Sequence, residues 1–73
     1  MNASSKKKLS QYERLAGTLR DRIAAGIYAR GDKLPSEMEL MDESGLSRST
    51  VRHALKVLVD EGLVRTEREI FSI

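Results

Sequence analysis

Residues 35–62 read PSEMELMDESGLSRSTVRHALKVLVDEG and contain start and stop signals for two consecutive helices. Ser36 and Glu39 have the spacing of a capping box, in which each side chain accepts a hydrogen bond from the other residue's backbone amide. The helix that follows is expected to be barely two turns long, because Gly45 supplies the left-handed residue that stops it. Ser47 then caps the next helix after a tight turn. This pattern predicts a helix-turn-helix over about residues 37–56.

The second helix of this pair separates apolar from polar side chains. A buried stripe ending at Gly62 is predicted from apolar residues at three- and four-residue intervals, namely Val51, Ala54, Leu55, Leu58 and Val59. The remaining surface carries hydroxyl groups and positive charge, from Ser47, Arg48, Ser49, Thr50, Arg52, His53 and Lys56. Such a face suits the major groove of DNA, where Arg48 or Arg52 can donate two hydrogen bonds to the O6 and N7 atoms of guanine. The free amides of the first turn suit a phosphate.

The flanking segments complete a small fold. Helical periodicity predicts a first helix that starts at a Ser10 cap and ends at Gly26, with a buried stripe of Tyr12, Leu15, Ala16, Leu19 and Ile23. Residues 27–28 are expected to be a short extended piece before a turn at 30–32. Residues 63–66 and 70–73 have strand character, and 67–69 can turn the chain between them. The predicted fold class is mainly α: a three-helix winged helix-turn-helix over residues 10–73, with a short C-terminal β-hairpin wing at about 63–73.

Length and composition restrict the alternatives. A chain of 73 residues with a net charge of +2 forms one domain at most. The charge is unevenly distributed, because the charged side chains of residues 35–44 are all acidic and the ionisable side chains of residues 47–56 are all basic. The absence of cysteine excludes disulfides and thiolate zinc sites and is consistent with a cytoplasmic protein. Residues 1–9, which include Lys6–Lys8, are expected to be a flexible basic tail, and no apolar run indicates a signal peptide or a membrane span.

Catalysis is not expected. The chain has one histidine and no cysteine, so no cluster resembles a metal site. Ser49 and His53 lie four residues apart, but no carboxylate is placed to orient the imidazole. The glycines form no loop of a recognised phosphate-binding spacing. We therefore expect no catalytic residue, no metal and no cofactor.

Three segments carry a family resemblance. The runs GDKLPSE at 31–37, SRSTVR at 47–52 and EGLV at 61–64, with their spacing, resemble the N-terminal domain of GntR-type regulators. The sequence of residues 51–64 is most similar to that of HutC-like members. The resemblance implies a bacterial transcription regulator, in most members a repressor, whose partner is a palindromic double-stranded DNA operator bound as a homodimer. In such proteins a C-terminal domain binds a small-molecule effector and usually supplies the dimer contact.

The resemblance also implies roles for individual residues. Residues 47–50 and Arg52 would read the groove, and Ser36 and Glu37 would lie near phosphate at the start of the preceding helix. With the basic wing residues, the expected DNA-binding set is Ser36, Glu37, Ser47, Arg48, Ser49, Thr50, Arg52, His53, Lys56, Arg65 and Arg68. Two positions depart from the family. Met38 stands where many members have a basic residue, and residues 66–70 lack the glycine-containing wing. Arg65 and Arg68 could replace part of the wing contact, which Glu67 and Glu69 would oppose.

Other functions stay open at this point. A winged helix can serve as a protein-interaction module without nucleic acid, and it would then place an exposed apolar patch on the third helix. A DNA-binding module fused to a non-regulatory enzyme is a further alternative. No effector domain follows Ile73, so the chain is either a fragment or a regulator without a sensor. A piece of this size can be monomeric alone and dimeric in the full-length protein.

Overall fold

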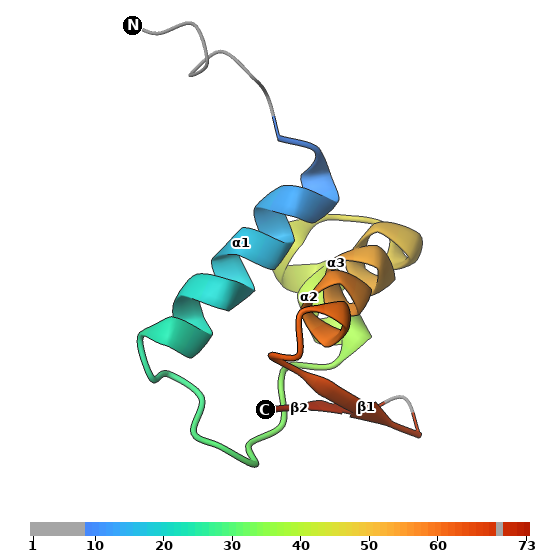
Figure 1. Cartoon of the computed structure of the whole chain (residues 1–73). Coiled ribbons are helices and arrows are strands. Elements are labelled where there is room, and N and C mark those ends of the chain that lie inside the picture. Colours follow the sequence, from blue (N-terminus) through green and yellow to red (C-terminus); the bar gives the residue numbers. More distant parts are fainter. Residues whose placement is uncertain (1–8, 69) are drawn as a thin grey trace, which may run out of the picture.

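The computed structural model describes residues 9–68 and 70–73, which form three helices and a hairpin (Figure 1). The elements are α1 (Gln11–Ala24), α2 (Glu37–Ser44), α3 (Arg48–Asp60), β1 (Arg65–Glu67) and β2 (Ile70–Ser72). In Figure 1, α1 lies along one side of the molecule and the hairpin lies below the end of α3. The predicted fold class is confirmed. Lys6–Lys8 and Glu69 lie outside the described residues, and no helix within the described part is long and apolar enough to cross a bilayer.

Each helix begins at a serine whose hydroxyl accepts a hydrogen bond from a backbone amide. Ser36 accepts from the amide of Glu39 and donates its own amide to the Glu39 carboxylate, which confirms the predicted capping box. Ser10 forms the same box with Glu13, where the sequence analysis predicted only the serine cap. Ser47 caps α3 through the Thr50 amide. These caps satisfy first-turn amides that otherwise have no partner inside the helix.

The ends of α2 and α3 depend on glycine in a left-handed conformation. Gly45 has φ +75° and donates its amide to the Met41 carbonyl, so α2 stops after eight residues as predicted. Helix α3 ends at Asp60, two residues before the predicted Gly62. Gly62 has φ +80° and lies beyond the helix, where its left-handed conformation lets the Leu63 amide donate back to the Leu58 carbonyl.

One apolar core joins all the elements. Its fully buried members come from the three helices and are Leu19, Leu40, Val51, Ala54, Leu55 and Leu58. Val59, predicted to belong to the buried stripe of α3, is only half-buried.

Two ion pairs lie at the rim of this core. Arg20 of α1 binds Glu61 at the end of α3 with N–O distances of 3.0 and 2.8 Å, and this hydrogen bonding raises the pKa of Arg20. Hydrogen bonds to Tyr28 and Glu43 likewise raise the pKa of Arg22.

The hairpin is antiparallel. Its register pairs Arg65 with Ser72 and Glu67 with Ile70, and Arg68 lies in the turn that follows β1. Strand β1 starts two residues later than predicted, because Leu63 still closes the end of α3. Arg68 has φ +52°, a conformation that side chains with a Cβ adopt at a cost.

The expected extended piece at residues 27–28 is wrong. Both residues lie in a bend, and the Ile27 amide donates to the Arg22 carbonyl, so this segment still terminates α1. Strand-like pairing occurs later, where Lys33 forms a bridge with Ser72. The amide of Leu34 donates to the Phe71 carbonyl at 2.8 Å, which fastens the loop between α1 and α2 to the hairpin. The wing therefore has support from residues 33–34, which follow the predicted turn at 30–32 and for which no pairing was predicted.

Candidate nucleic-acid interface

The exposed face of α3 is polar and free of acidic residues until Asp60. At its start, the Ser47 hydroxyl lies 2.9 Å from the Thr50 hydroxyl and 3.3 Å from that of Ser49. The helix dipole adds partial positive charge at the same end. The opposite side of α3 is buried in the core, so all of this polar surface is held on a packed helix.

Glu37, in the first turn of α2, binds both arginines of the α3 face. Its Oε1 atom lies 3.3 Å from Nη1 of Arg48, and its Oε2 atom lies 3.0 Å from Nε of Arg52. The Glu37 side chain is only 13% exposed, whereas those of Arg48 and Arg52 are 53% and 56% exposed. The carboxylate is thus turned toward α3 and largely covered, while the guanidinium groups remain open to solvent.

This arrangement orients the guanidinium groups without using up their donors. Arginine has five N–H donors, and the Glu37 contact of Arg52 engages its Nε. The terminal nitrogens of Arg52 stay available for a two-pronged contact of the kind that guanine accepts in the major groove. Holding the side chain in place in advance also reduces the conformational entropy lost on binding.

His53 lies on the other flank of α3, toward α1. Its ring stacks on Tyr12 with centroids 3.7 Å apart and planes 11° from parallel. From the helical pattern, His53 was expected to face solvent and Tyr12 to belong to the buried stripe of α1. The structure leaves His53 exposed and Tyr12 half-buried, and it brings the two rings into contact.

The remaining predicted residues are more dispersed. Lys56 is exposed and lies 3.7 Å from Asp60, an i, i+4 pair that contributes little at such exposure. Arg65 and Arg68 are exposed on the hairpin, separate from the Glu37 cluster. Ser36 caps α2, and its hydroxyl is engaged by the Glu39 amide. The predicted set therefore divides into a compact group on α2 and α3 and a second group on the wing.

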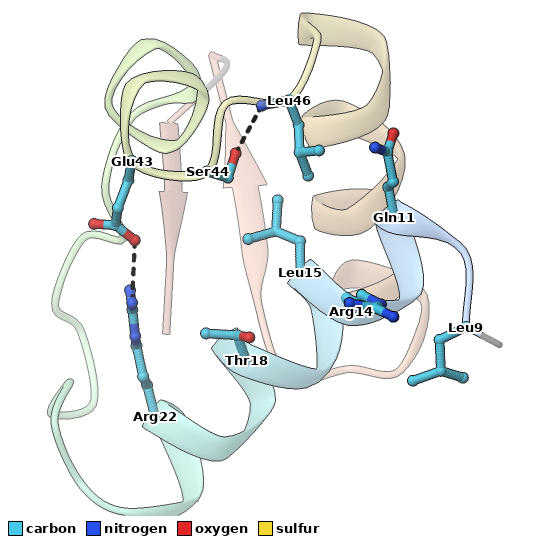
Figure 2. A pocket seen from close by; sticks show the side chains of 9 residues that line it. All are labelled: Leu9, Gln11, Arg14, Leu15, Thr18, Arg22, Glu43, Ser44 and Leu46. Carbon is cyan, nitrogen blue, oxygen red and sulfur yellow. Dashed lines mark hydrogen bonds and ion pairs between the residues drawn. The ribbon is translucent and has the colours of Figure 1, made fainter. Parts of the chain in front are cut away.

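A hollow of about 590 Å³ lies away from this face, between α1 and the end of α2 (Figure 2). Apolar side chains of Leu9, Leu15 and Leu46 line it, and the Arg22–Glu43 ion pair spans one side at 3.0 Å. It holds no nucleophile paired with a general base. Within the described residues, no group of histidine and carboxylate side chains is arranged to hold a metal ion.

Comparison with known proteins assigns the chain to a protein family. The family described as "Bacterial regulatory proteins, gntR family" matches residues 11–70, which include the three helices, β1 and the first residue of β2. The chain belongs to the GntR family. Because the match spans the predicted GDKLPSE, SRSTVR and EGLV segments, the family prediction is confirmed.

Relatives of this GntR-family domain are transcription regulators. The Exu regulon transcriptional regulator of Escherichia coli K12 is 44% identical over 57 residues, which are 78% of this chain and 22% of that protein. The histidine utilization repressor of Klebsiella aerogenes is 40% identical over 53 residues, again 22% of the relative. The chain thus spans about a fifth of the length of the curated relatives it matches.

A solved structure shares the fold of this GntR-family domain. The DNA-binding domain of AraR, in complex with operator ORR3, superposes with a TM-score of 0.85 at 30% identity. The superposition covers 92% of this chain and 83% of the AraR chain. The three helices and hairpin are therefore those of a winged-helix domain of this family.

Proposed function

We propose that this domain binds double-stranded DNA sequence-specifically by placing α3 in the major groove, as the DNA-reading part of a bacterial transcription regulator that acts as a repressor. The observation that carries the proposal is the cluster of Arg48, Arg52 and Glu37 on an exposed helix face. Two guanidinium groups contact one largely covered carboxylate there, beside the hydroxyl groups of the first turn. Major-groove readout requires donors of this kind on a rigid helix.

The other predicted residues have distinct roles in this proposal. The hydroxyls of Ser47, Ser49 and Thr50 and the first-turn amides of α3 contact phosphate or nearby base edges. Lys56 lies farther along the same face and interacts with the backbone. Ser36 places the start of α2 near a phosphate, whereas Glu37 acts through the two arginines, because a carboxylate would repel a phosphate. Arg65 and Arg68 bring positive charge from the wing to the flanking DNA.

The remaining parts of the proposal concern the longer protein. The named relatives are several times longer than this chain, which supports a regulator with a further, effector-binding domain. A homodimer would present two copies of α3 to a palindromic operator, with half-sites about one helical turn apart. As a DNA-bound regulator of a bacterium it would work in the cytoplasm. No catalytic role is proposed, because the family relatives are named as regulators.

The competing role as a protein-interaction module receives less support. It calls for an apolar patch on α3, yet the large exposed apolar side chains in the described part of the chain are Leu9, Ile27, Met38 and Ile70, and these lie elsewhere. Among the described residues, the outward side of α3 carries arginine, histidine, lysine and hydroxyl groups.

Selection of bound duplexes from a random pool, followed by NMR titration with the selected duplex, tests the proposal. We expect a defined consensus and the largest amide shifts in residues 47–56. A consensus with two inverted halves would support dimeric use. Failure to enrich any sequence, or shifts confined to another surface, would overturn the proposed function.

A further inference from the structure

Met38, in the first turn of α2, is an exposed apolar residue inside the helix-turn-helix. Among residues 9–68 and 70–73, the other large exposed apolar side chains precede α1, lie in the loop after it or belong to β2. Met38 is 53% exposed, so more than half of its surface is in contact with water. The proposed function assigns no contact to this side chain.

The residues on either side of Met38 have partners of their own. Glu37 binds the two arginines of α3, with N–O distances of 3.3 and 3.0 Å. The Glu39 carboxylate accepts a hydrogen bond from the Ser36 amide at 2.8 Å. Met38 carries no charge and no hydrogen-bond donor, so it does not join either arrangement. What it presents at the surface is a flexible apolar chain that ends in a methyl group.

The helical repeat places Met38 on the open side of α2, next to the arginines of α3. Each residue of an α-helix is turned by about 100° from the last, so a step of three residues back along the chain turns by about 60° in the same sense. In that order, Glu43 binds Arg22 of α1, Leu40 is buried in the core, and Glu37 binds the arginines of α3. Met38 follows Glu37 in the same sense, and it therefore lies beyond the α3 side of the helix and away from α1.

The surroundings of Met38 favour a small apolar ligand group over a phosphate or a protein. Helix α2 has four acidic side chains and no basic one, so no side chain beside Met38 on this helix attracts a phosphate. One exposed methionine among polar residues is also far smaller than a protein interface. On the base edges of the major groove, the apolar group is the C5 methyl of thymine, which apolar side chains contact.

We propose that Met38 reads a thymine by packing its terminal methyl group against the C5 methyl of that base, beside the bases that Arg48 and Arg52 read. This inference rests on the proposed function and extends base readout from α3 to the start of α2. The arginines distinguish bases by donating hydrogen bonds, whereas Met38 distinguishes them by the apolar surface that is removed from water. The domain should therefore prefer thymine at a position that no arginine contacts.

Deoxyuridine tests this assignment, because it pairs with adenine as thymine does and lacks only the C5 methyl. Each thymine of the selected duplex is replaced in turn, and fluorescence anisotropy measures the affinity. For the parent protein, we expect replacement of one thymine to weaken binding by about three- to tenfold, the scale of a lost methyl contact. Met38→Ala should weaken binding of the thymine duplex by a similar factor and should then not respond to that replacement.

A matched variant controls for the loss of an exposed apolar side chain. Ile27→Ala shortens such a side chain in the loop after α1 and should respond to deoxyuridine as the parent does. Met38→Ala should fold, because the side chain is exposed and alanine favours a helix, and thermal unfolding checks this. The proposal is overturned if the selected sequence has no defined thymine, or if Met38→Ala removes no deoxyuridine effect.

NMR of the parent with carbon-13 in its methionine methyl groups gives a direct readout of the contact. The Met38 methyl resonance should differ between the complex with the thymine duplex and the complex with its deoxyuridine counterpart. Met41, which is half-buried on the same helix, should give nearly equal resonances in the two complexes. Equal Met38 resonances in the two complexes would contradict the methyl contact.

The same experiments separate this inference from the proposed function. A parent protein that enriches no sequence removes both. A parent that yields a consensus, and loses affinity when Arg52 is changed, retains the proposed function. If Met38→Ala then responds to every deoxyuridine as the parent does, only the thymine contact is lost.

Discussion

The helix-turn-helix and the wing are both proposed to contact DNA, but their backbone conformations are stabilised in different ways. In the helix-turn-helix, serine caps and Gly45 match the backbone that they occupy, and Glu37 orients the arginines of the neighbouring helix. In the wing, a residue with a Cβ adopts φ +52° at position 68, and β1 carries both a basic and an acidic side chain, Arg65 and Glu67. The helix-turn-helix is thus preorganised by its own residues, whereas the turn of the wing is strained.

This difference predicts where specificity and where non-specific affinity reside. A preorganised donor loses little entropy on binding and discriminates between bases, whereas exposed charges on a strained turn add affinity that depends on salt. Four variants test that division, beginning with the one expected to have the largest effect.

Arg52→Ala removes a donor pair from the preorganised region. We expect a loss of about ten- to hundredfold in affinity for the selected duplex, and relaxed preference at one base position, because a bidentate arginine–guanine contact contributes about 1–3 kcal/mol. Anisotropy with single-base variants of the duplex measures both effects. Arg30→Ala, an exposed arginine in the loop between α1 and α2, is the control for loss of charge. An equal effect of the two variants would contradict base readout by Arg52.

Gly45→Ala strains the turn between α2 and α3. A Cβ at this position meets no atom within 4 Å, so the cost comes from φ +75° alone and is about 1 kcal/mol. Thermal unfolding should show a decrease in Tm of about 4–8 °C. The same change at Gly17, inside α1, also meets no atom within 4 Å and should stabilise by about 0.5–1 kcal/mol. Equal signs for the two variants would refute the conformational explanation.

Glu37→Gln releases the two arginines and removes one negative charge. Ordering a free arginine on binding costs about 0.5–1.5 kcal/mol, so affinity for the selected duplex should fall while affinity for random DNA rises slightly. The measured quantity is the ratio of the two affinities, which we expect to decrease by about three- to tenfold. Asp42→Asn, an exposed acid on the same helix, removes the same charge and should leave the ratio unchanged. A ratio that is unaffected in both would show that Glu37 does not preorganise the site.

Arg68→Gly is expected to have the smallest effect and to separate strain from charge. Relief of the positive φ exceeds the added flexibility of glycine by about 0.5 kcal/mol, so Tm should rise slightly. Arg68→Ala keeps the strain and should leave Tm near that of the parent. Both variants should reduce the slope of log affinity against log salt by about one, as expected for loss of one phosphate contact. An unchanged slope would remove the wing from the interface.

The sequence was most informative where the determining interactions are local. Ser36 with Glu39, Gly45, and Ser47 lie within a few residues of the groups they satisfy, so the start and stop of α2 and the start of α3 could be predicted. The failures occurred where distant segments meet. The bridge between Lys33 and Ser72 shows no periodicity along the chain and was not predicted, whereas a short extended piece was expected at 27–28.

The candidate site shows the same limit. Its residues on α3 could be identified from the helical pattern, but their partners could not. Glu37 was expected near phosphate, and only the packing of α2 against α3 brings it to Arg48 and Arg52. Tyr12 has the spacing of a core residue, and only the packing of α1 against α3 brings its ring onto His53. Neither contact has a local signal in the sequence, because each joins two helices.

The distribution of charge along α3 also affects how the domain reaches its target. The helix starts with hydroxyls and two arginines and ends at Asp60, with Glu61 directly after it. A polyanion is attracted to the start of the helix, whereas Asp60 and Glu61 at the other end are paired with Lys56 and Arg20, so the field favours approach toward the arginine-bearing part of α3. Productive collisions should therefore be a larger share of all collisions at low ionic strength. Added salt should slow association more than it speeds dissociation.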